Sequence, residues 1–403
     1  MTDAPVRVLL LEQIHPDAVE LLTSSGFVVE SVDRALDEDE LIERLGGVTL
    51  LGIRSKTHVT ARVLDAAPNL MAIGAFCIGT NQIDLVAASA RGVTVFNAPF
   101  SNTRSVVELA IAEIISMTRR LTEKSSLMHA GVWDKSADGA HEVRGRTLGI
   151  VGYGNIGTQL SVLAENLGMK VIFFDTADRL ALGNAQRCLS MKELLAESDV
   201  VTLHVDGRPS NENFFGEADF ASMRPGSLFL NLSRGFVVDY GALRANIEGG
   251  HIAGAAVDVF PIEPKGRGDE FVSELRGLGN VILTPHIGGS TEEAQQDIGR
   301  FVAGKFRDFV LAGSTSMSVN VPGLSLPRAE GTLRLIHLHR NVPGVLARVN
   351  GLLADNGVNV EAQMLGTRGD IGYVVTDSAS GVTQPIVDQI RALPETIRLR
   401  VIF

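Results

Sequence analysis

Short apolar runs alternate with amphipathic segments along the first hundred residues. Apolar runs occur at 6–11, 27–32, 48–53, 70–75 and 93–96, a length typical of buried strands. The segments between them, 16–23, 38–45, 61–67 and 84–90, carry the periodicity of short helices. Alternating strands and helices predict βαβ units around a parallel sheet. This part has no glycine-rich phosphate loop.

A second α/β series is predicted further along the chain. Residues 102–118 form a long amphipathic segment, predicted to be a helix with Glu108 and Glu113 on its solvent-facing side. Strands are then predicted at 148–151, 170–174, 200–203, 227–232, 252–257 and 281–283, and a helix at 156–167. The fold class is therefore α/β, with two doubly wound parallel-sheet domains.

The C-terminal part changes pattern. Residues 311–326 are rich in Gly, Ser and Pro and are interpreted as a linker. Strands are predicted at 333–339, 358–365, 371–376 and 396–403, and helices after Asn341 and at 382–393. Asn341 is expected to cap the first of these helices, with Pro343 in its first turn and Gly357 at its end. The order βαββαβ predicts a ferredoxin-like domain.

Composition narrows the classes of function. The chain has 403 residues, enough for two to four domains, and a formal charge of −11 without a dense Lys/Arg run. A nucleic-acid partner is therefore not expected. No apolar stretch reaches the length of a membrane span, and the N-terminus lacks the pattern of a secretory signal. The two cysteines, Cys77 and Cys188, lie far apart, so a disulfide framework is excluded and a cytoplasmic location is expected.

A glycine motif marks a candidate dinucleotide site. Residues 152–157 read GYGNIG, which matches G-x-G-x-x-G between a predicted strand and a predicted helix. Gly152 would permit the tight turn, Gly154 the approach of the pyrophosphate, and Gly157 close packing of helix and strand. Asp175 ends the next strand, where a carboxylate would bind the ribose 2′-OH and repel a 2′-phosphate. NAD is therefore the expected cofactor. A turn role for Asp175 alone is the alternative, and the glycine motif upstream makes it the less favoured one.

Three charged residues follow later strands of the same predicted sheet. Arg234, Glu263 and His286 all fall beyond carboxyl ends of strands, where ligands of open parallel sheets bind. In a hydride transfer, Arg234 could bind a carboxylate, His286 could exchange a proton, and Glu263 could orient the imidazole ring. Each residue alone fits an ordinary structural role. Their common placement favours catalysis.

Longer stretches resemble a known family. They are 76–82 (FCIGTNQ), 96–105 (FNAPFSNTRS), 149–157 (GIVGYGNIG), 233–235 (SRG), 258–260 (DVF) and 283–291 (LTPHIGGST). By these motifs the chain resembles the D-isomer-specific 2-hydroxyacid dehydrogenases along nearly its whole length, and its tail resembles an ACT regulatory domain.

The resemblance implies roles for individual residues. It makes Arg234, Glu263 and His286 the catalytic set, without metal. The remaining implied contacts fall into three groups. The NAD contacts are Gly152, Gly154, Asn155, Ile156, Gly157, Asp175, Leu232, Ser233, Asp258, Gly288 and Gly289. The substrate contacts are Arg54, Ser55, Lys56, Ile78, Gly79 and Asn102. The effector contacts are His339, Asn341 and Asn359.

The resemblance also implies an architecture and an activity. Residues 1–101 and 291–326 would form a flavodoxin-like substrate domain, 102–290 a Rossmann NAD domain, and 331–403 the ACT domain. The implied reaction is NAD-dependent oxidation of 3-phospho-D-glycerate to 3-phosphooxypyruvate, the first step of L-serine biosynthesis, in a homotetramer inhibited by L-serine. Two alternatives stay open, namely a reductase of glyoxylate or hydroxypyruvate and a non-catalytic NAD-binding scaffold. Asp206, where many relatives have Pro, departs from the family pattern.

Overall fold

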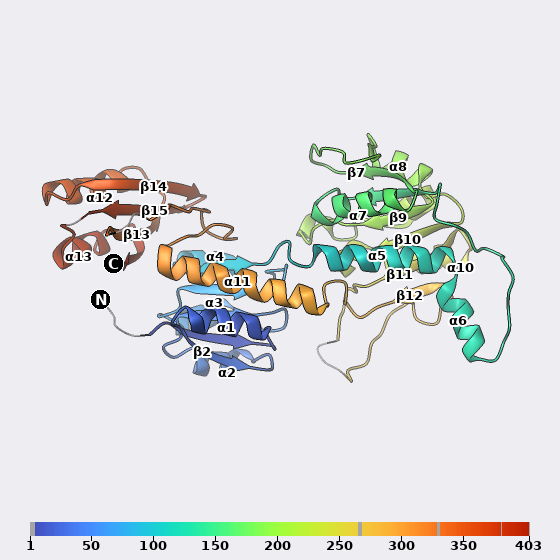
Figure 1. Ribbon diagram of the computed structural model, residues 1–403, viewed down its shortest axis with the longest axis horizontal. Coiled ribbons are helices and arrows are strands. Elements are labelled where there is room, and N and C mark those ends of the chain that lie inside the picture. Colours follow the sequence, from blue (N-terminus) through green and yellow to red (C-terminus); the bar gives the residue numbers. More distant parts are fainter. Residues whose placement is uncertain (1–4, 265–267, 329–330, 380, 403) are drawn as a thin grey trace. The chain divides into compact units, whose positions relative to one another are not determined.

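The chain forms two compact units. The computed structural model describes residues 5–264, 268–328, 331–379 and 381–402. The first unit comprises residues 1–101 and 295–403, and the second comprises residues 102–294. Figure 1 shows the elements of each unit, coloured along the sequence.

The first unit contains a five-stranded parallel sheet with the strand order β2-β1-β3-β4-β5. Its strands are β1 (Arg7–Leu11), β2 (Val28–Val32), β3 (Leu50–Ile53), β4 (Ala72–Ala75) and β5 (Thr94–Asn97). Its helices are α1 (Pro16–Ser24), α2 (Glu38–Arg44), α3 (Ala61–Ala66), α4 (Leu85–Ala90) and the late helix α11 (Glu292–Ala312). Because β1, β3 and β4 are adjacent and parallel, the loops that follow them meet at one edge of the sheet.

Helix α11 supplies part of the core of this sheet, although it lies two hundred residues away in the sequence. Phe306 packs edge-to-face against Phe76 and Phe96, with ring centroids 6.2 and 6.5 Å apart. A Cβ atom on Gly74 would lie only 2.5 Å from Val302 Cγ1, so the helix approaches the strand where a side chain is missing. Two segments that lie far apart in the sequence therefore build this core.

The second unit contains a seven-stranded parallel sheet with the order β12-β11-β10-β9-β6-β7-β8. Its strands are β6 (Thr147–Val151), β7 (Lys170–Phe174), β8 (Gln186–Arg187), β9 (Val200–Leu203), β10 (Ser227–Asn231), β11 (Ile252–Val257) and β12 (Val281–Leu283). Its helices are α5 (Thr103–Thr118), α6 (Leu121–His129), α7 (Asn155–Asn166), α8 (Met191–Glu197), α9 (Glu217–Ser222) and α10 (Tyr240–Glu248), with single 3₁₀ turns at Pro209–Asn211 and Gly235–Val237. The sheet order reverses beside β6, the position where doubly wound sheets bind ligands.

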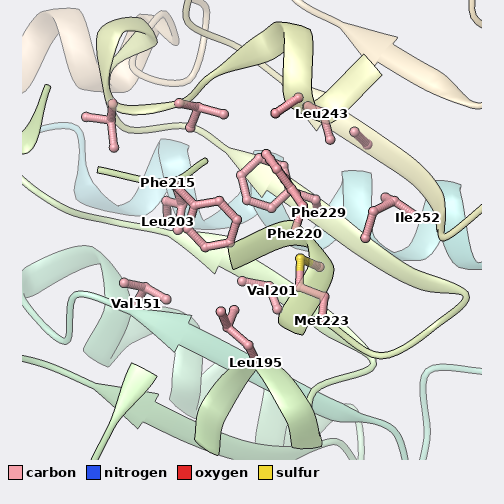
Figure 2. Packing of buried hydrophobic residues seen from close by; sticks show 14 of the residues in the cluster. Val151, Leu195, Val201, Leu203, Phe215, Phe220, Met223, Phe229, Leu243 and Ile252 are labelled. Carbon is pink, nitrogen blue, oxygen red and sulfur yellow. The ribbon is translucent and has the colours of Figure 1, made fainter. Parts of the chain in front are cut away.

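Two apolar layers enclose this sheet. Figure 2 shows the layer on one face, where Phe215, Phe220 and Phe229 pack together below Leu243. On the other face, residues of α5 and α7 such as Val107 and Leu160 pack on the strands.

The placement predicted for Glu113 on α5 is wrong. Its side chain is buried, with 3% of the residue exposed, on the face that also carries Val106 and Ala110. Glu108, one turn earlier, is exposed as predicted and forms an ion pair with Arg104.

The C-terminal tail forms a four-stranded antiparallel sheet with the order β14-β15-β13-β16. Its elements are β13 (Leu333–Arg340), α12 (Val345–Asp355), β14 (Val360–Arg368), β15 (Ile371–Ser378), α13 (Gln384–Arg391) and β16 (Thr396–Ile402). Leu335 packs with residues of α12 and α13 on one face of the sheet, and Ile336 packs with Val321 on the other. The predicted βαββαβ order is confirmed.

One predicted helix cap is wrong. Helix α12 begins at Val345 with Gly344 as its N-cap, and Gly344 has φ = 89°. Asn341 instead donates from Nδ2 to the Gly369 carbonyl, 3.0 Å away. The pair Pro343-Gly344 thus turns the chain before the helix starts.

The predicted α/β fold class is confirmed, but several elements escaped sequence reasoning. The sequence pattern does not predict strand β8, which has only two residues. It also predicts none of the helices α6, α8, α9, α10 and α11. Within the described ranges, no helix combines the length and apolarity needed to cross a bilayer. Cys77 and Cys188 form no disulfide with each other.

Candidate active site

The glycine loop after β6 has the shape expected of a dinucleotide-binding turn. Gly152 has φ = 93°, and a Cβ atom there would lie 2.5 Å from the His204 carbonyl oxygen. A Cβ atom on Gly157 would lie 2.4 Å from the Gly152 oxygen. Side chains at these two positions would therefore break the turn and its packing against α7.

Helix α7 begins with its backbone N–H groups unclaimed by a cap side chain. Gly154 is the N-cap residue, and nothing lies within 4 Å of the position of a Cβ atom there. The helix starts at Asn155, followed by Ile156 and Gly157. Free N–H groups and the helix dipole attract anions, so this helix end can hold a pyrophosphate.

Asp175 lies just beyond β7, next to the glycine loop. Its Oδ2 accepts a hydrogen bond from the Tyr153 backbone at 2.8 Å, and its Oδ1 accepts one from the Ala177 backbone at 2.8 Å. Arg179 Nε lies 3.5 Å from Oδ2. The turn role and the ribose role are compatible, because each carboxylate oxygen can accept a second hydrogen bond.

His286 and Glu263 form a direct pair in the second unit. The Nδ1 atom of His286 lies 2.8 Å from Oε2 and 3.0 Å from Oε1 of Glu263. An ionised carboxylate only accepts hydrogen bonds, so Nδ1 carries the hydrogen and Nε2 is left for proton exchange. His286 adopts a left-handed backbone, with φ = 54°. Such a conformation is uncommon for a residue other than glycine and is typical of functional sites.

This pairing changes the acidity of both groups. The hydrogen bond with Glu263 raises the pKa of His286 above its ordinary value, against the opposing effect of burial. Burial acts to raise the pKa of Glu263, but hydrogen bonds from His286 and from the Phe260 backbone lower it overall. The pair therefore favours imidazolium beside carboxylate.

Asp258 anchors the loop that carries His286. Its Oδ1 accepts hydrogen bonds from Thr284 Oγ1 at 2.6 Å and from the Ile287 backbone at 2.8 Å. Its Oδ2 accepts one from the Gly288 backbone at 2.8 Å. The residue is 1% exposed. Sequence reasoning placed Asp258 at the nicotinamide but missed this anchoring role, and a buried Asp after a strand is the signal that could have indicated it.

Arg234 follows β10 and Leu232-Ser233. Its Nη1 donates to the Ser233 carbonyl at 2.7 Å, and Asn231 Nδ2 donates to the Arg234 carbonyl at 3.0 Å. Ser233 donates to Asn231 Oδ1 from its backbone at 3.0 Å and from its hydroxyl at 2.8 Å. Asn231, which sequence reasoning missed, thus holds the loop that presents the guanidinium.

The departure from the family pattern at Asp206 lies beside this arginine. A Cβ atom on Gly207 would lie 3.2 Å from Arg234 Nε, so the loop 206–208 runs along the Arg234 side chain. Asp206 is held by Arg208, whose Nε lies 2.7 Å from Oδ1. Hydrogen bonds from Arg208 lower the pKa of Asp206. The carboxylate therefore stays ionised and adds negative charge near Arg234.

The expected substrate residues divide between the two units. Arg54, Ser55 and Lys56 follow β3 in the first unit, and Ile78 and Gly79 lie in the loop after β4. Asn97 Nδ2 donates to the Ile78 carbonyl at 2.6 Å. In the second unit, Asn102 precedes α5, and a Cβ atom on Gly289 would lie 2.1 Å from its Nδ2. Within each unit, these residues cluster on loops that follow strands or precede a helix.

In the tail, the three expected effector residues have different settings. His339 is buried on β13, with Nδ1 2.8 Å from the Arg340 carbonyl and Nε2 without a hydrogen-bond partner. Its ring lies over Gly372 of β15, where a Cβ atom would be 2.3 Å from Cε1. Asn341, directly after β13, and Asn359, directly before β14, are both exposed.

The fold and the glycine loop of the second unit are those of an NAD-binding domain of the D-2-hydroxyacid dehydrogenase type. The family model described as "D-isomer specific 2-hydroxyacid dehydrogenase, NAD binding domain" matches residues 111–288. A second model, "AHAS small subunit-like ACT domain", matches residues 335–398. The expectations of an NAD cofactor and of an ACT domain are thereby confirmed.

Full-length relatives specify the family further. The chain is 49% identical to D-3-phosphoglycerate dehydrogenase of Haemophilus influenzae, covering 99% of this chain and 97% of that protein. It is also 49% identical to D-3-phosphoglycerate dehydrogenase of Escherichia coli strain K12, covering 99% and 98%. Among solved structures, D-lactate dehydrogenase from Aquifex aeolicus complexed with NAD and lactic acid matches with a TM-score of 0.66 and 26% identity, covering 75% of this chain and 95% of that chain. The chain belongs to the D-3-phosphoglycerate dehydrogenase family.

Proposed function

We propose that this protein oxidises 3-phospho-D-glycerate to 3-phosphooxypyruvate with NAD, and so catalyses the first step of L-serine biosynthesis. The observation that carries the proposal is the His286–Glu263 pair, with Nδ1 and Oε2 2.8 Å apart in the unit that binds NAD. Relatives named D-3-phosphoglycerate dehydrogenase over the full chain length support the choice of substrate.

In this proposal the residues of the second unit handle the reacting alcohol. Nε2 of His286 accepts the hydroxyl proton, and Glu263 stabilises the imidazolium that results. Arg234 binds the substrate carboxylate and polarises the oxygen that becomes the ketone. Bound NAD would supply the hydride acceptor for the carbon that carries this hydroxyl, so the alcohol loses a proton from its oxygen and a hydride from its carbon.

The residues proposed for NAD fit that group. The open space at Gly154 and the free N–H groups of α7 suit the pyrophosphate, with Asn155, Ile156 and Gly157 around it. Asp175 suits the ribose hydroxyls. The remaining proposed contacts, on the nicotinamide side, are Leu232, Ser233, Asp258, Gly288 and Gly289.

The first unit is proposed to bind the phosphorylated end of the substrate. Arg54, Ser55 and Lys56 supply two cations and a hydroxyl on one loop, and the backbones of Ile78 and Gly79 supply donors. Asn102 is proposed as a further contact. We assign residues 1–101 and 291–326 to the substrate-binding domain, 102–290 to the NAD-binding domain and 331–403 to the regulatory domain.

We further propose that L-serine binds the tail at His339, Asn341 and Asn359 and inhibits a homotetramer. The ACT-domain match and the unpartnered Nε2 of His339 support an effector site there. The cytoplasmic location stays a prediction based on the sparse cysteines.

A steady-state assay with NAD tests the proposed function. We expect kcat/KM to be higher for 3-phospho-D-glycerate than for D-glycerate or D-lactate. Arg54→Ala should raise KM for the phosphorylated acid and leave the others nearly unchanged, because the lost contact is with phosphate. The reverse reaction is assayed with NADH, where a preference for glyoxylate or hydroxypyruvate over 3-phosphooxypyruvate would indicate the alternative reductase. No turnover in either direction would indicate a non-catalytic scaffold.

A further inference from the structure

The loop proposed to bind the substrate phosphate is held through its backbone by a buried carboxylate. Oε1 of Glu12 accepts hydrogen bonds from the backbone N–H groups of Arg54 at 3.2 Å and Thr57 at 2.8 Å. Oε2 accepts one from the Lys56 backbone at 3.0 Å. Glu12 is 8% exposed. One side chain therefore satisfies three backbone donors that no strand pairing satisfies.

The backbone of Glu12 is itself in an unusual conformation. Glu12 directly follows β1, the strand next to β3, and has φ = 64°, while the following Gln13 has φ = 55°. Two consecutive non-glycine residues in the left-handed region carry strain, which persists only where the surroundings fix it. Strain beside a candidate binding loop points to a functional reason for this turn.

A second buried side chain holds the same loop from the other side. Nε2 of Gln82 donates to the Arg54 carbonyl at 2.5 Å and to the Gly79 carbonyl at 3.4 Å. The main-chain carbonyl of Gln82 accepts a hydrogen bond from Val59 at 2.8 Å. Gln82 thus connects the loop after β3 to the loop after β4.

This arrangement leaves the charges of the loop available. Both oxygens of Glu12 accept hydrogen bonds from backbone groups, so the carboxylate does not pair with the side chains of Arg54 and Lys56. Within the part of the chain that the structure describes, neither Arg54 nor Lys56 forms an ion pair, and the Arg54 guanidinium donates a hydrogen bond to the Glu12 carbonyl at 3.5 Å. Two cations on a backbone held at both ends are suited to a dianionic phosphate.

We propose that Glu12 is a positioning residue for the phosphate-binding loop, with Gln82 holding the opposite side. The inference rests on the proposed function, because the loop needs a phosphate to bind. Glu12 does not touch the substrate in this account. It fixes the backbone from which the Arg54 and Lys56 side chains project, so its loss should weaken recognition of the phosphate and spare the chemistry in the other unit.

The test is Glu12→Gln, which keeps the size of the side chain but replaces one carboxylate oxygen by an NH₂ group that cannot accept a hydrogen bond from the loop. Reduction of 3-phosphooxypyruvate is compared with reduction of hydroxypyruvate, its unphosphorylated counterpart. We expect KM for the phosphorylated substrate to rise by roughly tenfold or more, with kcat within about twofold, because charge-assisted hydrogen bonds are lost. KM for hydroxypyruvate should change little. Glu43→Gln, on the exposed side of α2, is the matched control.

Combining Glu12→Gln with Arg54→Ala and Lys56→Ala separates positioning from general damage. If Glu12 acts through these side chains, its effect on KM should disappear in their absence. Equal losses with both substrates, or an effect that persists without the two cations, would overturn the inference. An unchanged KM in Glu12→Gln would overturn it as well.

A second variant keeps the inference testable if Glu12→Gln folds poorly. Gln82→Met keeps the side-chain length and removes the donor to Arg54, and it should raise KM selectively for the phosphorylated substrate. Unselective or absent effects in this variant would also count against the loop restraint. If the unmutated protein shows no preference for the phosphorylated substrate, the proposed function itself fails, and the inference fails with it.

Discussion

Replacing Glu113 by Gln should remove a pH-dependent loss of stability from the second unit. Glu113 lies on α5 with both carboxylate oxygens buried and without hydrogen-bond partners. Burial, and secondarily the charge of Asp258, raises the pKa of Glu113 from 4.5 to about 8. The folded protein therefore keeps this group protonated at neutral pH, whereas the unfolded chain ionises it.

The sign and size of the effect follow from proton linkage. Between the unfolded pKa of 4.5 and the folded pKa of about 8, the folded state binds one proton more than the unfolded state. The contribution of Glu113 to stability is thus highest below pH 4.5 and falls by about 1.4 kcal/mol per pH unit across this window. Summed over the shift from 4.5 to about 8, the loss is about 5 kcal/mol. Gln stays neutral, so Glu113→Gln lacks this slope.

Hydrogen exchange measured by mass spectrometry on α5 peptides, at pH values from 5 to 8, provides the assay. The opening free energy of Glu113→Gln minus that of the unmutated protein should grow with pH. Glu108→Gln is the control on the same helix, because Glu108 is exposed and its ion pair with Arg104 adds little. A constant difference across the range would refute the reasoning, since it would mean that Glu113 has the same charge in both states.

Four further predictions concern catalysis, cofactor choice and control. His286→Ala should lower kcat by on the order of a hundredfold or more, and oxidation should run best at alkaline pH. Because Glu263 raises the pKa of His286, Glu263→Gln should move the rise of the oxidation rate to lower pH, which a pH profile of kcat would show. The protein should prefer NAD clearly over NADP, and Asp175→Ala should narrow that preference; equal efficiencies before mutation would contradict the ribose role. L-serine should lower the initial rate at saturating substrate, and Asn341→Ala should abolish this inhibition. If serine neither lowers the rate nor binds to the tail, the tail is not a serine-binding regulatory domain.

The sequence predicts the strands and the glycine loop of the second unit well because their signals are local. The turn at Gly152 needs a residue that tolerates φ = 93°, and Asp175 must end the strand after it, so the pattern is visible in a short stretch. Arg234, Glu263 and His286 follow strands that each form a clear apolar run. The pairing of His286 with Glu263 could then be expected, although its 2.8 Å distance could not.

Features that depend on distant residues could not be predicted in the same way. Helical periodicity predicts a solvent-facing Glu113 because it does not show that α5 also packs against the sheet on the side that carries this residue. The spacing to Pro343 predicts Asn341 as a helix cap, whereas the positive φ at Gly344 delays the start of the helix to Val345. The three backbone partners of Glu12 lie more than forty residues away, and no local pattern points to them.

The late helix α11 has a consequence for the order in which the protein folds during synthesis. The sheet of the first unit ends with β5 at Asn97, but the aromatic rings of Phe306 and Phe309 that cover Phe96 reach the ribosome exit only after the whole second unit. The second unit, residues 102–294, has its full set of strands by then and can fold while the chain is still growing. Until α11 is made, part of one apolar face of the first hundred residues stays uncovered, because α1 covers only the rest of it. This surface is where a growing chain most needs protection from aggregation.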